Sequence, residues 1–99
     1  MRTAHHPPLD DVALPDVLHA LSDPVRLEIV RTLAKDGESP CGALHAPVSK
    51  STLSHHLHVL REAGLTQTRA NGTKRIVSLR QIEIEERFPG LLDSVLDCN

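Results

Sequence analysis

The hydroxyl and imidazole side chains of residues 49–62 are the groups in this chain that are best suited to bind another molecule. Leu53, Leu57 and Leu60 recur at helical spacing and fall on one side of a helix. The opposite side carries Ser51, Ser54, His55, His58 and Glu62. Near the helix N-terminus this face is short and polar, with Lys50, Ser51, Thr52, Ser54 and His55. Small hydroxyls and an imidazole suit close approach to base edges, and Lys50 at a helix N-terminus suits a phosphate. The pattern therefore predicts a helix whose outer face contacts DNA.

A solvated outer face is the ordinary alternative for such a helix, because exposed polar faces are the default. Two neighbouring features favour the DNA interpretation. Pro47-Val48-Ser49 forms a tight turn after a short predicted helix, which is the order of a helix-turn-helix motif. A basic hairpin follows the polar helix directly.

That hairpin is predicted from Asn71-Gly72, which separates two runs with β-branched residues. Arg69, Lys74 and Arg75 lie close to its tip. Charges on a hairpin edge can serve solubility alone. Alternatively, they contact phosphate or the minor groove beside the helix, and so supply affinity rather than specificity.

The charge distribution supports a DNA-contacting segment even though the net charge of the chain is −2. Residues 49–80 contain six Lys or Arg and a single acid, Glu62, whereas the rest contains five Lys or Arg and twelve acids. A basic segment between acidic flanks is expected when one face meets phosphate and the remainder maintains solubility.

The elements that position these groups follow from caps and apolar periodicity. Helix-start signals are Ser22 or Asp23 before Pro24, Ser39 before Pro40, and Ser49, and Gly37 and Gly64 are stop signals. Helices are predicted over residues 14–21, 24–35, 40–46, 50–63 and from 80 onward, with the hairpin over 65–79 and a kink at Pro89. This order predicts a mainly α fold with a β-hairpin wing, a winged helix-turn-helix, over residues 11–99. Residues 1–10 are predicted to be a flexible arm.

The composition predicts an aliphatic core, since the 99 residues include one Phe and neither Trp nor Tyr. A thin core in a short chain is often completed by a second copy, so we expect a homodimer. No apolar run is long enough to cross a bilayer and no signal-peptide segment is present, so a cytoplasmic protein is expected. Cys41 and Cys98 are then expected to be free thiols.

The chain resembles the ArsR/SmtB family of bacterial repressors in three stretches. These are ALSDPVRLEIVRTLA (20–34), SKSTLSHHLHVLREAGL (49–65) and TRANGTKRIVSLR (68–80), the second being the most specific. The resemblance covers roughly residues 14–97. It implies a cytoplasmic homodimer that binds an imperfect inverted repeat near its own promoter and represses transcription until an inducer weakens binding.

The resemblance also implies where the contacts fall. DNA contacts would lie on Lys50, Ser51, Thr52, Ser54 and His55, with the wing cations Arg69, Lys74 and Arg75 beside them. His56 lies on the flank of the helix, where we expect it to be partly packed or near a phosphate. The first and last helices would form the dimer interface through Leu14, Val17, Leu18, Phe88, Leu91, Leu92 and Val95.

The sequence departs from the family at its metal sites. Pro40 and Gly42 stand where one family site has a Cys-x-Cys pair, and the last helix has Asp93 and Asp97 but no histidine for another. The seven histidines do not offer a convergent ligand spacing either. We therefore predict no metal and no cofactor.

Redox sensing is an alternative inducer hypothesis. Cys41 is expected at the second position of a helix, where the helix dipole would lower the pKa of the thiol. Cys98 lies one residue from the end of the sequence. A thiol switch through Cys41 and Cys98, within or between subunits, stands beside the simpler interpretation of two unrelated thiols.

Two further functions compete with a DNA-binding repressor. A winged-helix module that docks proteins would more often show an apolar or acidic groove where this chain has cations. An enzyme is disfavoured, because the sequence contains no phosphate loop, no nucleophile with a paired base and no converging carboxylates.

Overall fold

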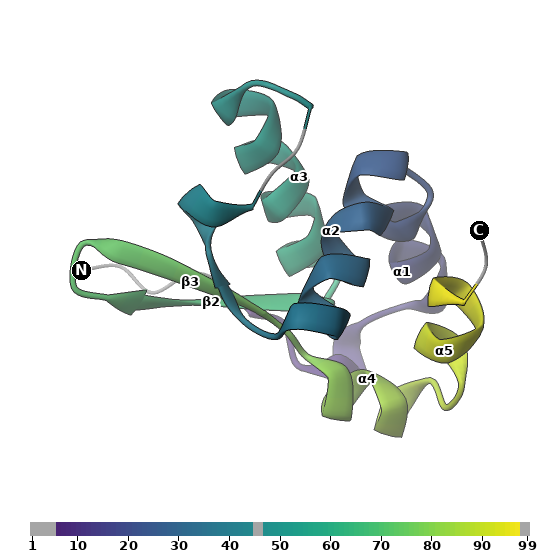
Figure 1. Ribbon diagram of the computed structural model, residues 1–99. Helices are drawn as coiled ribbons and strands as arrows, with labels where there is room; N and C mark the ends of the chain where they lie inside the picture. Colours follow the sequence, from purple (N-terminus) through teal and green to yellow (C-terminus); the bar gives the residue numbers. More distant parts are fainter. Residues whose placement is uncertain (1–5, 45–46, 98–99) are drawn as a thin grey trace.

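The computed structural model describes residues 6–44 and 47–97, in which short helices surround a small sheet (Figure 1). The elements run in the order η1 (Leu9–Asp11), α1 (Leu14–Leu21), α2 (Pro24–Asp36), β1 (Ser39–Pro40), η2 (Cys41–Ala43), α3 (Lys50–Glu62), β2 (Thr66–Asn71), β3 (Lys74–Leu79), α4 (Gln81–Arg87) and α5 (Leu91–Leu96). The predicted winged helix-turn-helix is confirmed. Among the described residues, no helix has the length and apolar character needed to cross a membrane.

The predicted starts of α2 and α3 are confirmed by their caps. Asp23 precedes α2 and its Oδ2 accepts hydrogen bonds from the backbone N–H groups of Val25 and Arg26, at 2.9 and 3.1 Å. Ser49 caps α3 by accepting from the backbone N–H of Thr52 at 3.2 Å. Gly37 ends α2 with φ at 83°, a conformation that glycine adopts without steric cost.

The wing is the antiparallel pair of β2 and β3, which projects away from the helices (Figure 1). Asn71 pairs with Lys74, so the connection is Gly72-Thr73 rather than Asn71-Gly72 as predicted. Gly72 has φ at 64°, as the tight turn requires. The hairpin itself is confirmed, displaced at its tip by one residue.

The predicted helix over residues 40–46 is wrong in its described part. Ser39–Pro40 forms β1 instead, which pairs with β3 in the register Ser39↔Val77 and Pro40↔Ile76. Cys41–Ala43 then forms only a single 3-10 turn. Pro40 has an extended backbone with ψ at 142°, and proline fits an edge strand because it has no N–H to donate. Residues 45–46 lie outside the described residues.

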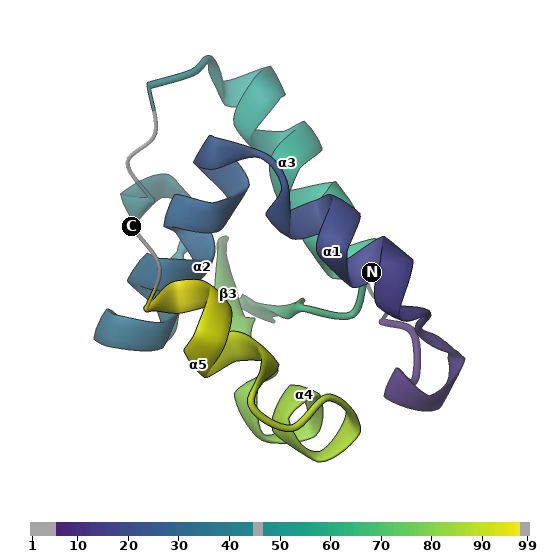
Figure 2. The same cartoon turned by 90° about the vertical axis from the view of Figure 1, so that its right-hand side faces the viewer.

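The core is aliphatic, as predicted. Its most buried side chains come from every layer: Val17, Val30, Leu60, Leu65, Val77 and Ile84. In the second view α1, α2 and α3 form one group of helices, and α4 leads to α5, which lies beside α2 (Figure 2). Phe88-Pro89-Gly90 separates α4 from α5, which confirms the predicted interruption at Pro89.

Residues 6–11 pack against the domain, whereas the sequence predicts a flexible arm through residue 10. Leu9 is only 8% exposed. The backbone carbonyls of Pro7 and Leu9 accept hydrogen bonds from Arg80 Nη1 and Arg87 Nε at 2.7 and 3.2 Å. These partners are more than 70 positions away in the sequence, so local patterns do not reveal the packing. Residues 1–5 lie outside the described residues.

Candidate nucleic-acid interface

The outer face of α3 is exposed, as predicted. Lys50, Ser51, Thr52, Ser54, His55 and His58 are all accessible to solvent. Leu60 is fully buried, while Leu53 and Leu57 are half-buried. Burial of the leucine side fixes which face of α3 points outward.

A chain of hydroxyls lines the beginning of α3. Ser49 Oγ donates to Thr52 Oγ1 at 3.0 Å and lies 3.2 Å from Ser51 Oγ. These bonds hold the three hydroxyls together at the helix terminus that carries the positive end of the helix dipole. The arrangement suits a phosphate oxygen, which accepts from hydroxyls and from a nearby lysine such as Lys50.

The histidines of α3 have different environments. His55 is exposed on the outer face. His58 Nδ1 accepts a hydrogen bond from Arg61 Nη2 at 3.0 Å, also at the surface. His56 is 8% exposed and packs inward, which agrees with the expectation that it is partly packed. Only His55 and His58 therefore remain available to a ligand on this face.

The three wing cations are not equivalent. Arg69 Nη2 donates to Glu38 Oε1 at 2.6 Å, in an ion pair between two half-exposed side chains. Lys74 and Arg75 are exposed, and no ion pair is recorded for them within the described residues. The Glu38 carboxylate thus offsets the charge of Arg69, and no local pattern indicates this pairing across 31 positions.

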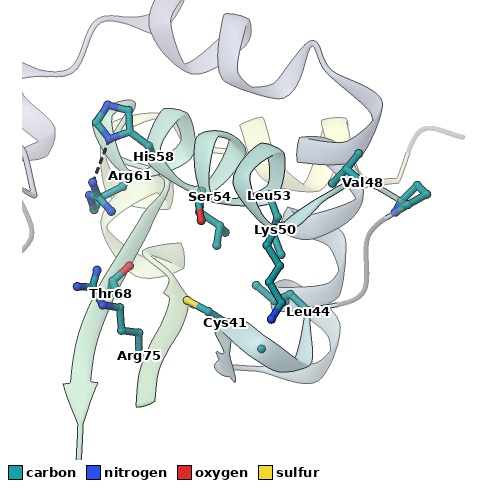
Figure 3. A pocket seen from close by; sticks show the side chains of 13 residues that line it. Cys41, Leu44, Val48, Lys50, Leu53, Ser54, His58, Arg61, Thr68 and Arg75 are labelled. Atoms are coloured by element: carbon teal, nitrogen blue, oxygen red, sulfur yellow. Dashed lines mark hydrogen bonds between the residues drawn. The ribbon is translucent and has the colours of Figure 1, made fainter. Parts of the chain in front are cut away.

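A groove of about 980 Å³ lies between η2, α3 and the wing (Figure 3). Its apolar floor includes Leu44, Leu53 and Leu57. Its polar and remaining residues are Cys41, Gly42, Pro47, Val48, Lys50, Ser54, His58, Arg61, Thr68 and Arg75. Three of these lining residues are permanent cations and none is a carboxylate, so the groove attracts anions.

Arg61 and Thr68 belong to this surface and were missed in the sequence analysis. Arg61 lies seven positions after Ser54, on the same side of α3, and this spacing was the available signal. Its Nε is buried without a hydrogen-bond partner among the described residues. Thr68 faces the groove from β2, which only the tertiary structure brings beside α3.

Cys41 is half-buried in the same groove, with its sulfur pointing inward (Figure 3). Burial raises the pKa of its thiol, and the positive charges of Arg75 and Arg61 only partly oppose this. The predicted lowering of the Cys41 pKa is therefore wrong, because the expected helix is a single 3-10 turn and desolvation dominates. Cys98 lies outside the described residues, so its distance to Cys41 is untested.

The proposed dimer residues divide into three groups. Leu14 and Leu18 on α1 are 42% and 47% exposed and form an apolar surface. Val17 and Leu92 are only 1% and 2% exposed, so they pack inside the chain rather than on an open face. Phe88, Leu91 and Val95 are half-buried against the core. The sequence pattern does not separate these three groups, because it gives only apolar spacing and not the exposure of each side chain.

Within residues 6–44 and 47–97, no three His, Cys, Asp or Glu side chains converge in a way that could hold a metal ion. His5, His45 and Cys98 fall outside these ranges, so the absence of a metal site in the whole chain stays a prediction.

These features define a DNA-binding protein of the winged-helix class: an outward-facing polar helix, a basic wing and a cation-lined groove between them. Comparisons with known proteins agree. A model of a helix-turn-helix domain matches residues 21–69. The chain belongs to the ArsR/SmtB family of winged helix-turn-helix transcriptional regulators, which bind DNA and are not enzymes.

Three relatives illustrate the similarity. The HTH-type transcriptional regulator YceK of Bacillus subtilis is 40% identical, over 87% of this chain and 89% of the relative. The arsenical resistance operon repressor of Staphylococcus xylosus is 42% identical, over 67% of this chain and 64% of the relative. The crystal structure of the repressor BigR from Xylella fastidiosa matches with a TM-score of 0.68 and 32% identity, over 87% of each chain.

Proposed function

We propose that this chain is a cytoplasmic homodimeric repressor that binds an inverted-repeat operator near its own promoter. One observation carries the proposal: the exposed polar face of α3 adjoins a groove. The residues that line this groove include three cations and no carboxylate. Several relatives are named repressors, which supports repression rather than activation as the function of this chain. The winged domain over residues 11–99, with residues 6–10 packed on it, is the unit that binds.

The first half of α3 enters the major groove in this proposal. Ser54 and His55 contact base edges, and His58 lies one turn further along the same surface. Lys50, Ser51 and Thr52 meet a phosphate at the helix N-terminus. Lys74 and Arg75 contact the backbone from the wing, and Arg69 joins them only when it exchanges Glu38 for a phosphate.

The groove between α3 and the wing then receives the DNA backbone. Arg61 extends from α3 and Arg75 from β3, and Thr68 adds a hydroxyl from β2 at the same end of the groove (Figure 3). A phosphate placed there would also satisfy the buried Nε of Arg61. This arrangement accounts for the absence of carboxylates among the residues that line the groove.

Dimerisation through the exposed Leu14 and Leu18 surface of α1 places two copies of α3 on one duplex. Two-fold symmetry matches an inverted repeat whose half-sites lie about one helical turn, roughly 34 Å, apart. The interface extends to Phe88, which follows α4, and to Leu91 and Val95 on α5. Val17 and Leu92 support it from within each protomer.

The experiment is a footprint on the DNA upstream of the gene, followed by affinity measurements on the protected sequence. His55→Ala or Ser54→Ala is expected to weaken specific binding by about 1–3 kcal/mol and relax preference at one base pair. Gln81→Ala, an exposed polar residue on α4, is the control and is expected to bind normally. Unchanged specific binding by His55→Ala would contradict the assignment of the α3 face.

The inducer stays a separate hypothesis. A thiol switch requires Cys41, whose raised pKa keeps the less reactive thiol form at neutral pH. Operator affinity measured before and after an oxidant or a persulfide, in wild type and Cys41→Ser, decides whether this residue responds. Equal responses in both proteins would remove Cys41 from the mechanism.

A further inference from the structure

A buried polar cluster lies behind α3, on the side away from the proposed DNA face. Arg26 and His56 are each 8% exposed, although arginine is seldom buried unless it is partnered. They lie 30 positions apart in the sequence, on α2 and α3. Neither touches the groove between α3 and the wing.

The guanidinium of Arg26 links three helices. Its Nε and Nη2 donate to the carbonyls of Ala20 and His19 at 2.7 and 3.3 Å. These carbonyls belong to the last turn of α1, and the carbonyl of His19 also accepts from the backbone N–H and the Oγ of Ser22, at 3.1 and 2.6 Å. Its Nη1 reaches His56 Nδ1 on α3 at 3.2 Å. Arg26, itself on α2, therefore fastens α3 to the end of α1, and these three helices lie together in Figure 2.

This contact assigns the hydrogen-bonding role of His56 Nδ1. A guanidinium has donors but no acceptor, so His56 Nδ1 must supply the lone pair. Its proton then resides on Nε2, and the ring is neutral. A protonated ring would direct a second cationic donor at Arg26 and lose the hydrogen bond.

The other charged group facing this nitrogen is Asp23. Its Oδ2 lies 3.9 Å from His56 Nδ1 but already accepts from the N–H groups of Val25 and Arg26 as the α2 cap. The remaining titratable neighbour is His55, whose ring centroid is 6.0 Å away. A proton on His56 Nδ1 would thus compete with Arg26 and draw Asp23 away from its cap.

We propose that Arg26 and neutral His56 are positioning residues that hold α3 in its DNA-binding orientation, and that protonation of His56 releases this hold. The proposal rests on the DNA-binding function proposed above. Loss of the Arg26–His56 hydrogen bond should then lower operator affinity as the solution is acidified from pH 7.5 to 5.5, the range in which imidazoles gain charge. His55 and His58 on the outer face act in the opposite direction, because protonation there adds attraction to phosphate.

The opposite signs make His56→Gln the informative variant. The glutamine Oε1 accepts from Arg26 but does not gain a proton in this pH range. We expect His56→Gln to bind the operator about as well as wild type at pH 7.5. The ratio of its affinity to that of wild type should rise at least about tenfold at pH 5.5, since a hydrogen bond to a charged group is lost only in wild type. His19→Gln, an exposed histidine on α1, is the control whose ratio stays constant.

A direct readout separates this proposal from the DNA-binding function. Two-dimensional 15N–1H spectra of the free wild-type protein at pH 7.5 should show His56 with an unprotonated Nδ1 and a protonated Nε2. A protonated Nδ1, or an affinity ratio for His56→Gln that does not change with pH, overturns the proposal. The expected tautomer in a protein that ignores its upstream DNA would instead refute the proposed function. Because the spectra need no variant, a protonated Nδ1 would overturn the proposal even if His56→Gln does not fold.

Discussion

At the scale of single residues, the charge of a side chain does not by itself decide whether it is free to bind a DNA phosphate. Arg69, Lys74 and Arg75 look alike in the sequence, but the structure pairs Arg69 with Glu38 at 2.6 Å and leaves the other two exposed without a recorded ion pair in the described chain. A paired cation must exchange its partner before it neutralises a phosphate. The contribution of Arg69 to the free energy of DNA binding is therefore smaller than that of Lys74 or Arg75.

Lys74→Ala should weaken binding to all DNA sequences alike, and should reduce the slope of log affinity against log salt by about 0.9. Arg69→Ala should reduce the same slope by less. Glu38→Gln should raise affinity by up to about fivefold at low salt, because it releases Arg69. Salt titrations of the three variants by fluorescence anisotropy provide the comparison. Equal slopes for Lys74→Ala and Arg69→Ala would show that the ion pair does not persist in solution.

Asp23 gives a second prediction at this scale. Hydrogen bonds from the N–H groups of Arg26 and Val25, together with the positive charge of the Arg26 side chain, lower its pKa below the ordinary 3.8. Because the folded pKa lies below the unfolded one, the ionised carboxylate stabilises the fold above about pH 4, and this is lost as the pH falls through the folded pKa. Asp23→Ala should cost about 0.5–2 kcal/mol at pH 7 and progressively less in acid. Urea unfolding across pH 2–7 tests this, and a constant difference would contradict it.

At the scale of elements, the junction between α3 and the wing is set by Gly64. Its φ of +80° strains any other residue, and a Cβ there would lie 2.8 Å from Val12 Cγ2. Gly37 has nearly the same φ, +83°, but no neighbour within 4 Å of an added Cβ. The two glycines therefore separate backbone strain from steric contact.

Gly37→Ala should lower the free energy of unfolding by about 1–2 kcal/mol through backbone strain alone. Gly64→Ala should cost about 1–3 kcal/mol more, because Val12 and the segment bearing it must move. Urea unfolding of both variants measures the difference. Equal losses would mean that the segment around Val12 adapts without cost.

At the scale of the whole molecule, exposure distinguishes an assembly surface from a core. Leu18 on α1 is 47% exposed, whereas Leu92 on α5 is 2% exposed, although both were assigned to the dimer interface from the sequence. A charge at the first position alters association, and a charge at the second is buried without a partner.

Leu18→Glu should yield a folded monomer with weakened operator binding, as measured by sedimentation velocity and anisotropy. Leu92→Glu should instead unfold the chain, which circular dichroism would reveal. Gln81→Glu adds the same charge at an exposed site on α4 and should stay dimeric. A Leu18→Glu protein that remains dimeric at micromolar concentration would exclude the α1 surface as the interface.

The sequence by itself determined the features that depend on neighbours along the chain. Asp23 and Ser49 as caps, the leucine stripe of α3, the two strands of the wing and the interruption at Pro89 were all predictable, because each rests on residues within one or two turns. The outward face of α3 followed from the same periodicity.

Only the tertiary structure decided the contacts between distant segments. These include the pairing of β1 with β3, the packing of residues 6–11, the Arg69–Glu38 ion pair and the hydrogen bond between Arg26 and His56. The environment of Cys41 also belongs here, since desolvation in the groove reverses the pKa shift expected from a helix. Local sequence patterns do not specify which distant side chain contacts a given atom. Ion pairs and burial between distant segments are therefore known only from the folded structure.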